Sequence, residues 1–278
     1  MSAPKAAMSD NPVLNPNYQY RAVKTETRGA VFEITLNRPE RLNTFNAEMQ
    51  RDFTALQMQI ERDPELRCVT IFAAGERAFG AGADLSWFEQ DWPAQRFRTE
   101  YRWIHDFFDV LERVELPVIA AVFGTCACGG LELAMACDFR IAAEDTRFGF
   151  TEGNINLVPG SGGCSRLVKM IGPGWAKELV LAGEFIDAAR ALQIGLVTRV
   201  VPRAKLEDEA RSLADKLVKK APLALGAAKA LINTCQQIDA TSGRVLERMA
   251  QSALILSNDH KEGVKAFREK RPPQYKGR

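Results

Sequence analysis

The chain has 278 residues, of which 46% are hydrophobic and 26% charged, and its 37 basic residues nearly balance 35 acidic ones. This composition is typical of a globular protein with a sizeable core. A net charge of +2 argues against a nucleic acid or a membrane surface as the main partner, and no apolar run reaches the roughly 20 residues that span a bilayer.

The first 20 residues are rich in proline and asparagine and contain neither an apolar stretch nor an arginine. We therefore expect a disordered leader over 1–20, without a secretory or organelle signal. The cysteines lie in mostly apolar surroundings, as expected for reduced thiols of a cytoplasmic protein. Because Cys126-x-Cys128 has no second Cys/His pair at zinc spacing, we predict no metal site.

Strands and helices alternate along the following part of the chain. The apolar pattern predicts strands over 31–36, 68–73, 117–123, 139–143 and 197–201. Helices are expected over 46–62, 94–115 and, after a glycine turn, 128–138. Beyond residue 203 the patterns are helical only. This order predicts an α/β core over 21–203 and a helical C-terminal region over 204–278.

One carboxylate, Glu132, stands in the stretch CGGLELAMACD, which otherwise resembles a protein core. A strand, a glycine turn and a helix present unpaired backbone N–H groups that can hold an anion or a developing oxyanion. Apolar flanks raise the pKa of a carboxyl, which makes it an effective acid or base near neutral pH. Taken alone, Glu132 fits better as an acid at a helix N-terminus, satisfied by N–H groups or an arginine.

A second glutamate, Glu152, lies beside apolar and glycine residues in FGFTEGNINLVPGSGG, and alone it fits an acid at a surface turn. The two stretches together resemble the signature region of the crotonase superfamily, the enoyl-CoA hydratases and isomerases. The resemblance covers about 22–278 and includes "ITLNRPERLNTFN", "RAFGAGADLSWF" and "ELVLAGEFIDAARALQIGLVTRVVP". Such breadth is more specific than a single short motif.

The resemblance implies an α/β spiral of repeated ββα units, with C-terminal helices that assemble a homotrimer or a dimer of trimers. It also implies that the backbone N–H groups of Ala83 and Gly129 form an oxyanion hole for an acyl-CoA thioester. The hydratases use two glutamates, and Glu132 and Glu152 fill both positions. We expect ionised Glu132 to deprotonate water and protonated Glu152 to deliver a proton to the α-carbon.

The same resemblance makes coenzyme A part of the substrate and implies no separate cofactor. Six positions match its contacts in the family: Ala81, Asp84, Leu85, Arg38, Arg41 and Lys270. The first three lie on the loop that receives the adenine and pantetheine portions, mainly through backbone groups. The two arginines are candidate phosphate contacts, and the lysine matches a position that often serves a neighbouring subunit. Each basic residue fits equally well as a solvated surface charge.

Three residues depart from the family pattern. Cys128 replaces the first of three glycines before the glutamate helix, and Thr151 stands where proline is common before the second glutamate. Asn156 replaces a glycine but can still adopt a left-handed backbone conformation. None of these changes removes a catalytic group, but Cys128 is expected to narrow the approach to the oxyanion hole.

Aromatic residues are concentrated after the oxyanion loop. Trp87, Phe88 and Trp92 lie nearest this loop and are predicted to contact the acyl chain. Trp103, Phe107 and Leu111 follow at helical spacing, which indicates packing against a core or a subunit.

These features predict an enoyl-CoA hydratase of fatty acid metabolism, which reversibly converts a 2-enoyl-CoA to a 3-hydroxyacyl-CoA. The alternatives within the superfamily are double-bond isomerisation, thioester hydrolysis and retro-aldol cleavage by a hydratase-lyase. A non-catalytic or RNA-binding relative is the alternative from another class, and the near-neutral charge argues against RNA. The sequence contains no GxSxG, P-loop or HExxH motif.

Overall fold

The computed structural model describes residues 18–89 and 91–277. The predicted leader lies outside the described residues except for its last three positions. There the hydroxyl of Tyr18 donates to Asp52 Oδ1 at 2.6 Å, and the hydroxyl of Tyr20 donates to Gln59 Oε1 at 2.9 Å. Both acceptors belong to helix α1 (Ala47–Arg62). The chain is therefore attached to the body of the molecule from residue 18 onward.

The larger of two sheets has the strand order β1-β2-β3-β5-β7-β10. Its strands are β1 (Val23–Arg28), β2 (Val31–Leu36), β3 (Cys68–Ala73), β5 (Val118–Val122), β7 (Phe139–Ala143) and β10 (Arg199–Val201). β1 pairs antiparallel with β2, and the other neighbours pair in parallel. The predicted strands all appear here. β1 was not predicted, because its polar sequence VKTETR forms an exposed edge without a clear apolar alternation.

A second sheet, of order β4-β6-β8-β9, is built from short strands. They are β4 (Ala78–Gly80), β6 (Thr125–Ala127), β8 (Arg147–Gly149) and β9 (Ile186–Asp187). The first three each follow a strand of the larger sheet and lead toward the next helix. Those helices are α2 (Ala94–Arg113), α3 (Gly129–Ala136) and α4 (Gly163–Leu181). The predicted fold of repeated ββα units is thereby confirmed.

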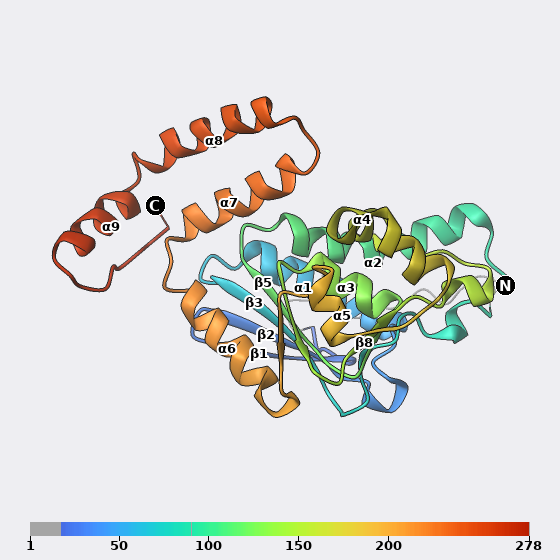
Figure 1. The fold of residues 1–278 in the computed structure, drawn as a ribbon. Coiled ribbons are helices and arrows are strands. Elements are labelled where there is room, and N and C mark those ends of the chain that lie inside the picture. Colours follow the sequence, from blue (N-terminus) through green and yellow to red (C-terminus); the bar gives the residue numbers. More distant parts are fainter. Residues whose placement is uncertain (1–17, 90, 278) are drawn as a thin grey trace.

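Helices cover both faces of the larger sheet (Figure 1). On one face, Ile34 and Ile71 belong to a buried cluster that includes Phe53 of α1 and Phe108 of α2. On the other face, sheet residues pack against α6 (Leu206–Leu217) in a second buried cluster. The sequence-based boundary places α6 in the C-terminal region, and these contacts pack it against the larger sheet. The short helix α5 (Ala188–Gln193) follows β9.

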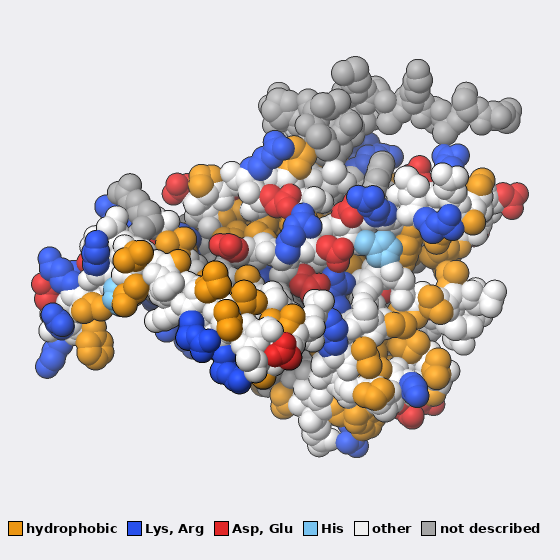
Figure 2. Space-filling model, turned by 90° about the horizontal axis from the view of Figure 1, so that it is seen from above, with side chains coloured by type: hydrophobic (Ala, Val, Ile, Leu, Met, Phe, Trp, Pro, Cys, Tyr) orange, Lys and Arg blue, Asp and Glu red, His pale blue; other side chains and the backbone are white. Residues whose placement is uncertain are grey.

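The last three helices, α7 (Pro222–Cys235), α8 (Ala240–Leu254) and α9 (Asn258–Arg268), form an arm that projects from the body (Figure 1). Apolar side chains gather along this arm, as Figure 2 shows. Its exposed large hydrophobic residues are Ile232, Val245, Leu246, Met249, Ile255, Leu256, Val264 and Phe267. An apolar surface of this kind is typical of a protein–protein contact. Within the described residues, no helix is long and apolar enough to cross a membrane.

Candidate active site

Glycines bring the N-terminus of α3 against the loop that follows β4. A Cβ atom on Gly130 would lie 2.2 Å from the carbonyl oxygen of Gly80, and one on Gly82 would lie 2.6 Å from the Cβ of Cys128. Because these distances leave no room for a side chain, the two backbones meet only through glycine. This approach places the loop of Ala83 beside the amide of Gly129.

The backbone amides of Ala83 and Gly129 are both left without an acceptor among the described residues. The amide of Phe45 donates to Gly82 O, and the amide of Asp84 donates to Phe45 O, so the N–H of Ala83 between them faces away from this pairing. Gly129 is the first residue of α3, where backbone N–H groups have no partner within the helix. Both residues line one cleft with a volume of about 760 Å³.

Glu132 lies one turn into α3, and its side chain is 1% exposed. Its Oε1 accepts hydrogen bonds from the backbone amides of Ser161, at 2.6 Å, and Gly163, at 2.8 Å. Burial raises the pKa of Glu132 to about 7, although these two amides favour the carboxylate. Glu132 lines the cleft and can therefore exchange a proton there near neutral pH.

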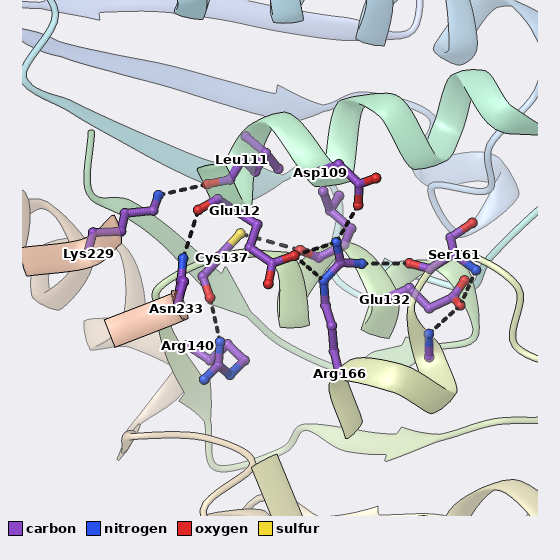
Figure 3. A network of polar contacts seen from close by, with 12 residues as sticks. Asp109, Leu111, Glu112, Glu132, Cys137, Arg140, Ser161, Arg166, Lys229 and Asn233 are labelled. Atoms are coloured by element: carbon purple, nitrogen blue, oxygen red, sulfur yellow. Dashed lines mark hydrogen bonds and ion pairs between the residues drawn. The ribbon is translucent and has the colours of Figure 1, made fainter. Parts of the chain in front are cut away.

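Arg166 holds the loop that contacts Glu132. Its guanidinium donates to Ser161 O at 2.9 Å, and it pairs with Asp109 and Glu112 of α2, each at 2.7 Å. Figure 3 shows this network around Arg166 next to the carboxyl of Glu132. Arg166 thus fixes the amide donors that orient the carboxylate.

Glu152 lines the same cleft and begins the short 3₁₀ helix η4 (Glu152–Ile155). Burial raises the pKa of Glu152, and its Oε2 is buried without a hydrogen-bond partner among the described residues. Its charge adds to the effect of burial on the pKa of Glu132. The two carboxyls are therefore coupled electrostatically across one cleft, which is a suitable arrangement for general acid–base chemistry.

The cleft also collects most of the predicted coenzyme A positions. Its lining includes Ala81, Asp84, Leu85 and Arg41, and in addition Arg77, which the sequence did not single out. Two predicted residues lie elsewhere. Arg38 forms an ion pair with Asp84 at 3.1 Å, which favours a role in holding the loop. Lys270 follows α9 on the arm and does not line the cleft of its own chain.

The aromatic wall of the cleft differs from the predicted one. Phe88 lines the cleft, whereas Trp87 and Trp92 do not. Trp87 is 9% exposed and packs against Phe88, and its carbonyl oxygen accepts from Trp92 Nε1 at 2.7 Å. Phe97 and Tyr101 of α2, stacked with ring centroids 5.2 Å apart, complete the wall. Phe97 and Tyr101 are four residues apart and therefore lie on one face of the helix. This spacing is the signal from which the sequence could have predicted their shared role in the wall.

A second cavity, of about 660 Å³, lies between α7 and the helices of the body, and neither glutamate lines it. Lys229 Nζ contacts the carbonyl oxygens of Leu111 and Leu116 at 2.7 and 2.9 Å. Asn233 donates to Glu112 O at 3.0 Å, and Figure 3 shows this bond together with the one between Lys229 and Leu111. Because these polar groups are engaged in structural contacts, we assign the chemistry to the cleft with the two glutamates. Among the described residues, no group of three or more His, Cys, Asp or Glu side chains is arranged to hold a metal ion.

Comparison with known proteins covers nearly the whole chain. The sequence model of the family described as enoyl-CoA hydratase/isomerase matches residues 26–278. The short-chain-enoyl-CoA hydratase of Clostridium acetobutylicum is 38% identical over 248 residues, which are 88% of this chain and 94% of that protein. The crotonyl-CoA hydratase of Syntrophomonas wolfei is 35% identical over 256 residues, covering 92% and 98%.

The structure agrees with these sequence matches. The crystal structure of an enoyl-CoA hydratase from Bacillus anthracis superimposes with a TM-score of 0.88 at 37% sequence identity. The match covers 93% of this chain and 100% of that one. The similarity therefore extends through the sheets, the cleft and the arm.

Proposed function

The chain belongs to the enoyl-CoA hydratase/isomerase family, and we propose that it catalyses the reversible addition of water to a 2-enoyl-CoA, which gives a 3-hydroxyacyl-CoA. One observation supports this most strongly. Two backbone amides without acceptors, the buried carboxyl of Glu132 and the half-buried carboxyl of Glu152 open onto the same cleft. Addition of water to a conjugated thioester needs both a site for a developing negative charge and a pair of proton-transfer groups.

The amides of Ala83 and Gly129 would bind the thioester carbonyl oxygen. When hydroxide adds at C3, negative charge moves onto this oxygen as the enolate forms. Two fixed N–H donors in a cleft stabilise the enolate more than the neutral carbonyl, and removal of one such donor typically costs about 3 to 4 kcal/mol. This stabilisation needs no reorganisation, because the glycine contacts already fix both loops.

Glu132 would remove the proton from water, and Glu152 would deliver a proton to C2. The division is supported by the different surroundings of the carboxyls. Glu132 Oε1 accepts from two backbone amides, which stabilise the carboxylate. Glu152 Oε2 is buried without such a donor, which favours its protonated form. In the reverse direction the two roles exchange.

The cleft lining supports a substrate that has both charged and apolar parts. Arg41 and Arg77 line the cleft and would contact the coenzyme A phosphates. Phe88, Phe97 and Tyr101 would wall the acyl chain. Coenzyme A would enter as part of the substrate, and no step of the proposed reaction uses a metal ion or a further cofactor.

The exposed apolar arm supports assembly into a homotrimer or a dimer of trimers, in which Lys270 would reach the substrate of a neighbouring copy. We further propose a cytoplasmic enzyme of fatty acid metabolism. Sedimentation of the wild type and of Leu256→Glu with Phe267→Glu tests the assembly. The double variant should sediment as a smaller species with unchanged helix content, whereas an unchanged sedimentation coefficient would contradict the role of the arm.

Product analysis tests the reaction itself. Crotonyl-CoA, a 3-enoyl-CoA and a 3-hydroxyacyl-CoA are each incubated with the wild-type protein and followed by mass spectrometry. Hydration raises the mass of crotonyl-CoA by one water, isomerisation leaves the mass unchanged, and thioester hydrolysis releases free coenzyme A. A product of either of the last two kinds, without the hydrated product, would exclude the proposed reaction.

A further inference from the structure

Cys128, the residue before the Gly129 amide, has a backbone conformation that residues with side chains rarely adopt. Its φ is 52° and its ψ is −129°. Such a conformation is strained for a residue other than glycine. The chain nevertheless carries a thiol here, and this side chain lines the cleft.

The Cys128 side chain contacts another residue that departs from the family pattern. Its Sγ lies 3.2 Å from the Oγ1 of Thr151, the residue before Glu152. The backbone amide of Cys128 also donates to Gly149 O at 3.1 Å. The thiol therefore connects the turn that carries one proposed oxyanion donor with the loop that carries the second glutamate.

Either the Thr151 hydroxyl or the Cys128 thiol can donate in this contact, and the two directions differ in which hydrogen remains free. A hydroxyl and a thiol each have one hydrogen to donate. When Thr151 donates to Sγ, the S–H of Cys128 is free to donate to a different acceptor. Glu152 Oε2, buried without a partner among the described residues, is the acceptor left open in the cleft.

The contact between Cys128 and Glu152 shifts their pKa values in the directions expected when a thiol donates to a carboxyl. Burial raises the pKa of the Cys128 thiol to about 11, and the negative charge of Glu152 raises it further. Burial also raises the pKa of Glu152, and nearby hydrogen-bond donors, first a backbone amide and then the Cys128 thiol, act in the opposite direction. A donor next to a carboxyl stabilises the carboxylate and disfavours loss of its own proton.

We propose that Cys128 is a positioning residue for Glu152, in which the Thr151 hydroxyl donates to Sγ and the S–H donates to the Glu152 carboxyl. The inference rests on the proposed function, because it assumes that Glu152 delivers a proton during hydration. By favouring the carboxylate, the thiol makes Glu152 a stronger acid than burial alone would permit. It also fixes the direction from which the proton reaches C2.

Three other titratable groups face Glu152 from the packed elements. They are Glu132 of α3, Tyr101 of α2 and Cys164 of α4, whose pKa values are all raised, by burial first and then by the charge of Glu152 among other groups. Tyr101, with a pKa of about 12, stays protonated near neutral pH, so Glu132 is the neighbour whose charge changes there. Variants at position 128 keep all three groups.

The test is the pH dependence of kcat/KM for crotonyl-CoA hydration in the wild type, Cys128→Ala, Cys128→Ser and Thr151→Val. Activity should fall at high pH when Glu152 loses its proton. In Cys128→Ala this alkaline limb should move upward by about 0.5 to 1 pH unit, because the carboxylate loses a donor. Cys128→Ser should keep the limb in place, and Thr151→Val should move it upward by less than Cys128→Ala does.

Two further variants separate positioning from structural effects. Cys164→Ala removes a thiol that is exposed on α4 and should leave the limb unchanged. Cys128→Gly relieves the backbone strain, so its thermal midpoint should equal or exceed that of Cys128→Ala, yet its alkaline limb should move by the same amount. If Cys128 had a purely structural role, the shift of the alkaline limb would instead vary with the thermal midpoint of each variant.

The outcomes distinguish this inference from the function on which it rests. A bell-shaped wild-type profile whose alkaline limb stays fixed in both Cys128→Ala and Cys128→Gly would overturn the positioning role alone. A shift in Cys128→Ser as large as that in Cys128→Ala would do the same. A wild-type protein that does not hydrate crotonyl-CoA would overturn the proposed function and this inference together.

Discussion

The backbone amide of Ser161 donates to Glu132 Oε1 at 2.6 Å, so the loop before α4 holds the buried carboxyl of α3. This contact offsets part of the penalty for burying a charge. The pKa of Glu132 still lies at about 7, compared with 4.5 for an exposed glutamate. The ionised base that we propose is therefore present only around neutral pH and above.

The pH dependence of turnover follows from this pKa. Because Glu132 must be ionised to deprotonate water, kcat/KM for hydration should fall on the acid side with a midpoint near pH 7. Below the midpoint the fall should approach tenfold per pH unit. Initial rates between about pH 5 and 9 measure this limb. An acid limb centred near the value of an exposed glutamate would show that Glu132 is not the titrating base.

Protein stability should change with pH in the opposite sense to activity. Between pH 4.5 and 7 the folded protein keeps a proton on Glu132 that the unfolded chain releases. The free energy of unfolding therefore falls as the pH rises through this window. Glu132→Gln removes that loss, so its free energy of unfolding relative to wild type should be about 3 kcal/mol higher at high pH than at low pH.

Urea unfolding at about pH 4 and about pH 8 measures this difference. Glu26→Gln on the exposed edge strand β1 is the matched control, and it should differ from wild type equally at both pH values. If Glu132→Gln and the wild type changed in parallel with pH, the buried carboxyl would not have the raised pKa described above.

Arg166 should affect turnover without touching the substrate. Arg166→Leu leaves Ser161 O, Asp109 and Glu112 without their shared donor, so the loop that orients Glu132 loosens. We expect kcat to fall by about 10- to 100-fold with a smaller change in KM, because misplacing a catalytic group lowers turnover. Arg113→Leu breaks an exposed pair with Glu61 at the end of α2, the helix of Asp109 and Glu112, and should leave kcat unchanged. If the two variants had equal values of kcat and KM, Arg166 would have no role in positioning Glu132.

Phe97 should restrict the acyl chain. Its ring lines the cleft and stacks on Tyr101, so Phe97→Ala enlarges the space next to the two carboxyls. The ratio of kcat/KM for a long or aryl enoyl-CoA to that for crotonyl-CoA should rise by about tenfold. Leu181→Ala, at an exposed position at the end of α4, should keep the wild-type ratio. An unchanged ratio in Phe97→Ala would place the acyl chain elsewhere.

The sequence predicted the parts of the structure that are encoded locally. β3 and β5 are continuous apolar strands, and Asn46 caps α1 by accepting from the Met49 amide at 2.9 Å. The short strands of the second sheet escaped prediction, because two or three residues cannot display a period of two. Glu132 and Glu152 were named from their motifs, and the structure places both on one cleft.

Tertiary contacts decided what the sequence could not. Trp87 and Trp92 are close in sequence to the oxyanion loop, but packing turns Trp87 inward, and Phe97 and Tyr101 from the next helix complete the wall. Arg38 was predicted as a candidate phosphate contact, and its ion pair with Asp84, 46 positions away, could not be read from the sequence. The contact between Cys128 and Thr151 joins residues 23 positions apart, and no local pattern shows it.

The rates of Glu132→Gln and Glu152→Gln test the central claim most directly. Both carboxyls transfer protons in the proposed hydration, so each variant should hydrate crotonyl-CoA at least about 100-fold more slowly than the wild type. The control Glu26→Gln should retain the wild-type rate. If both Glu132→Gln and Glu152→Gln kept rates within about tenfold of the wild type, proton transfer by this pair would be contradicted.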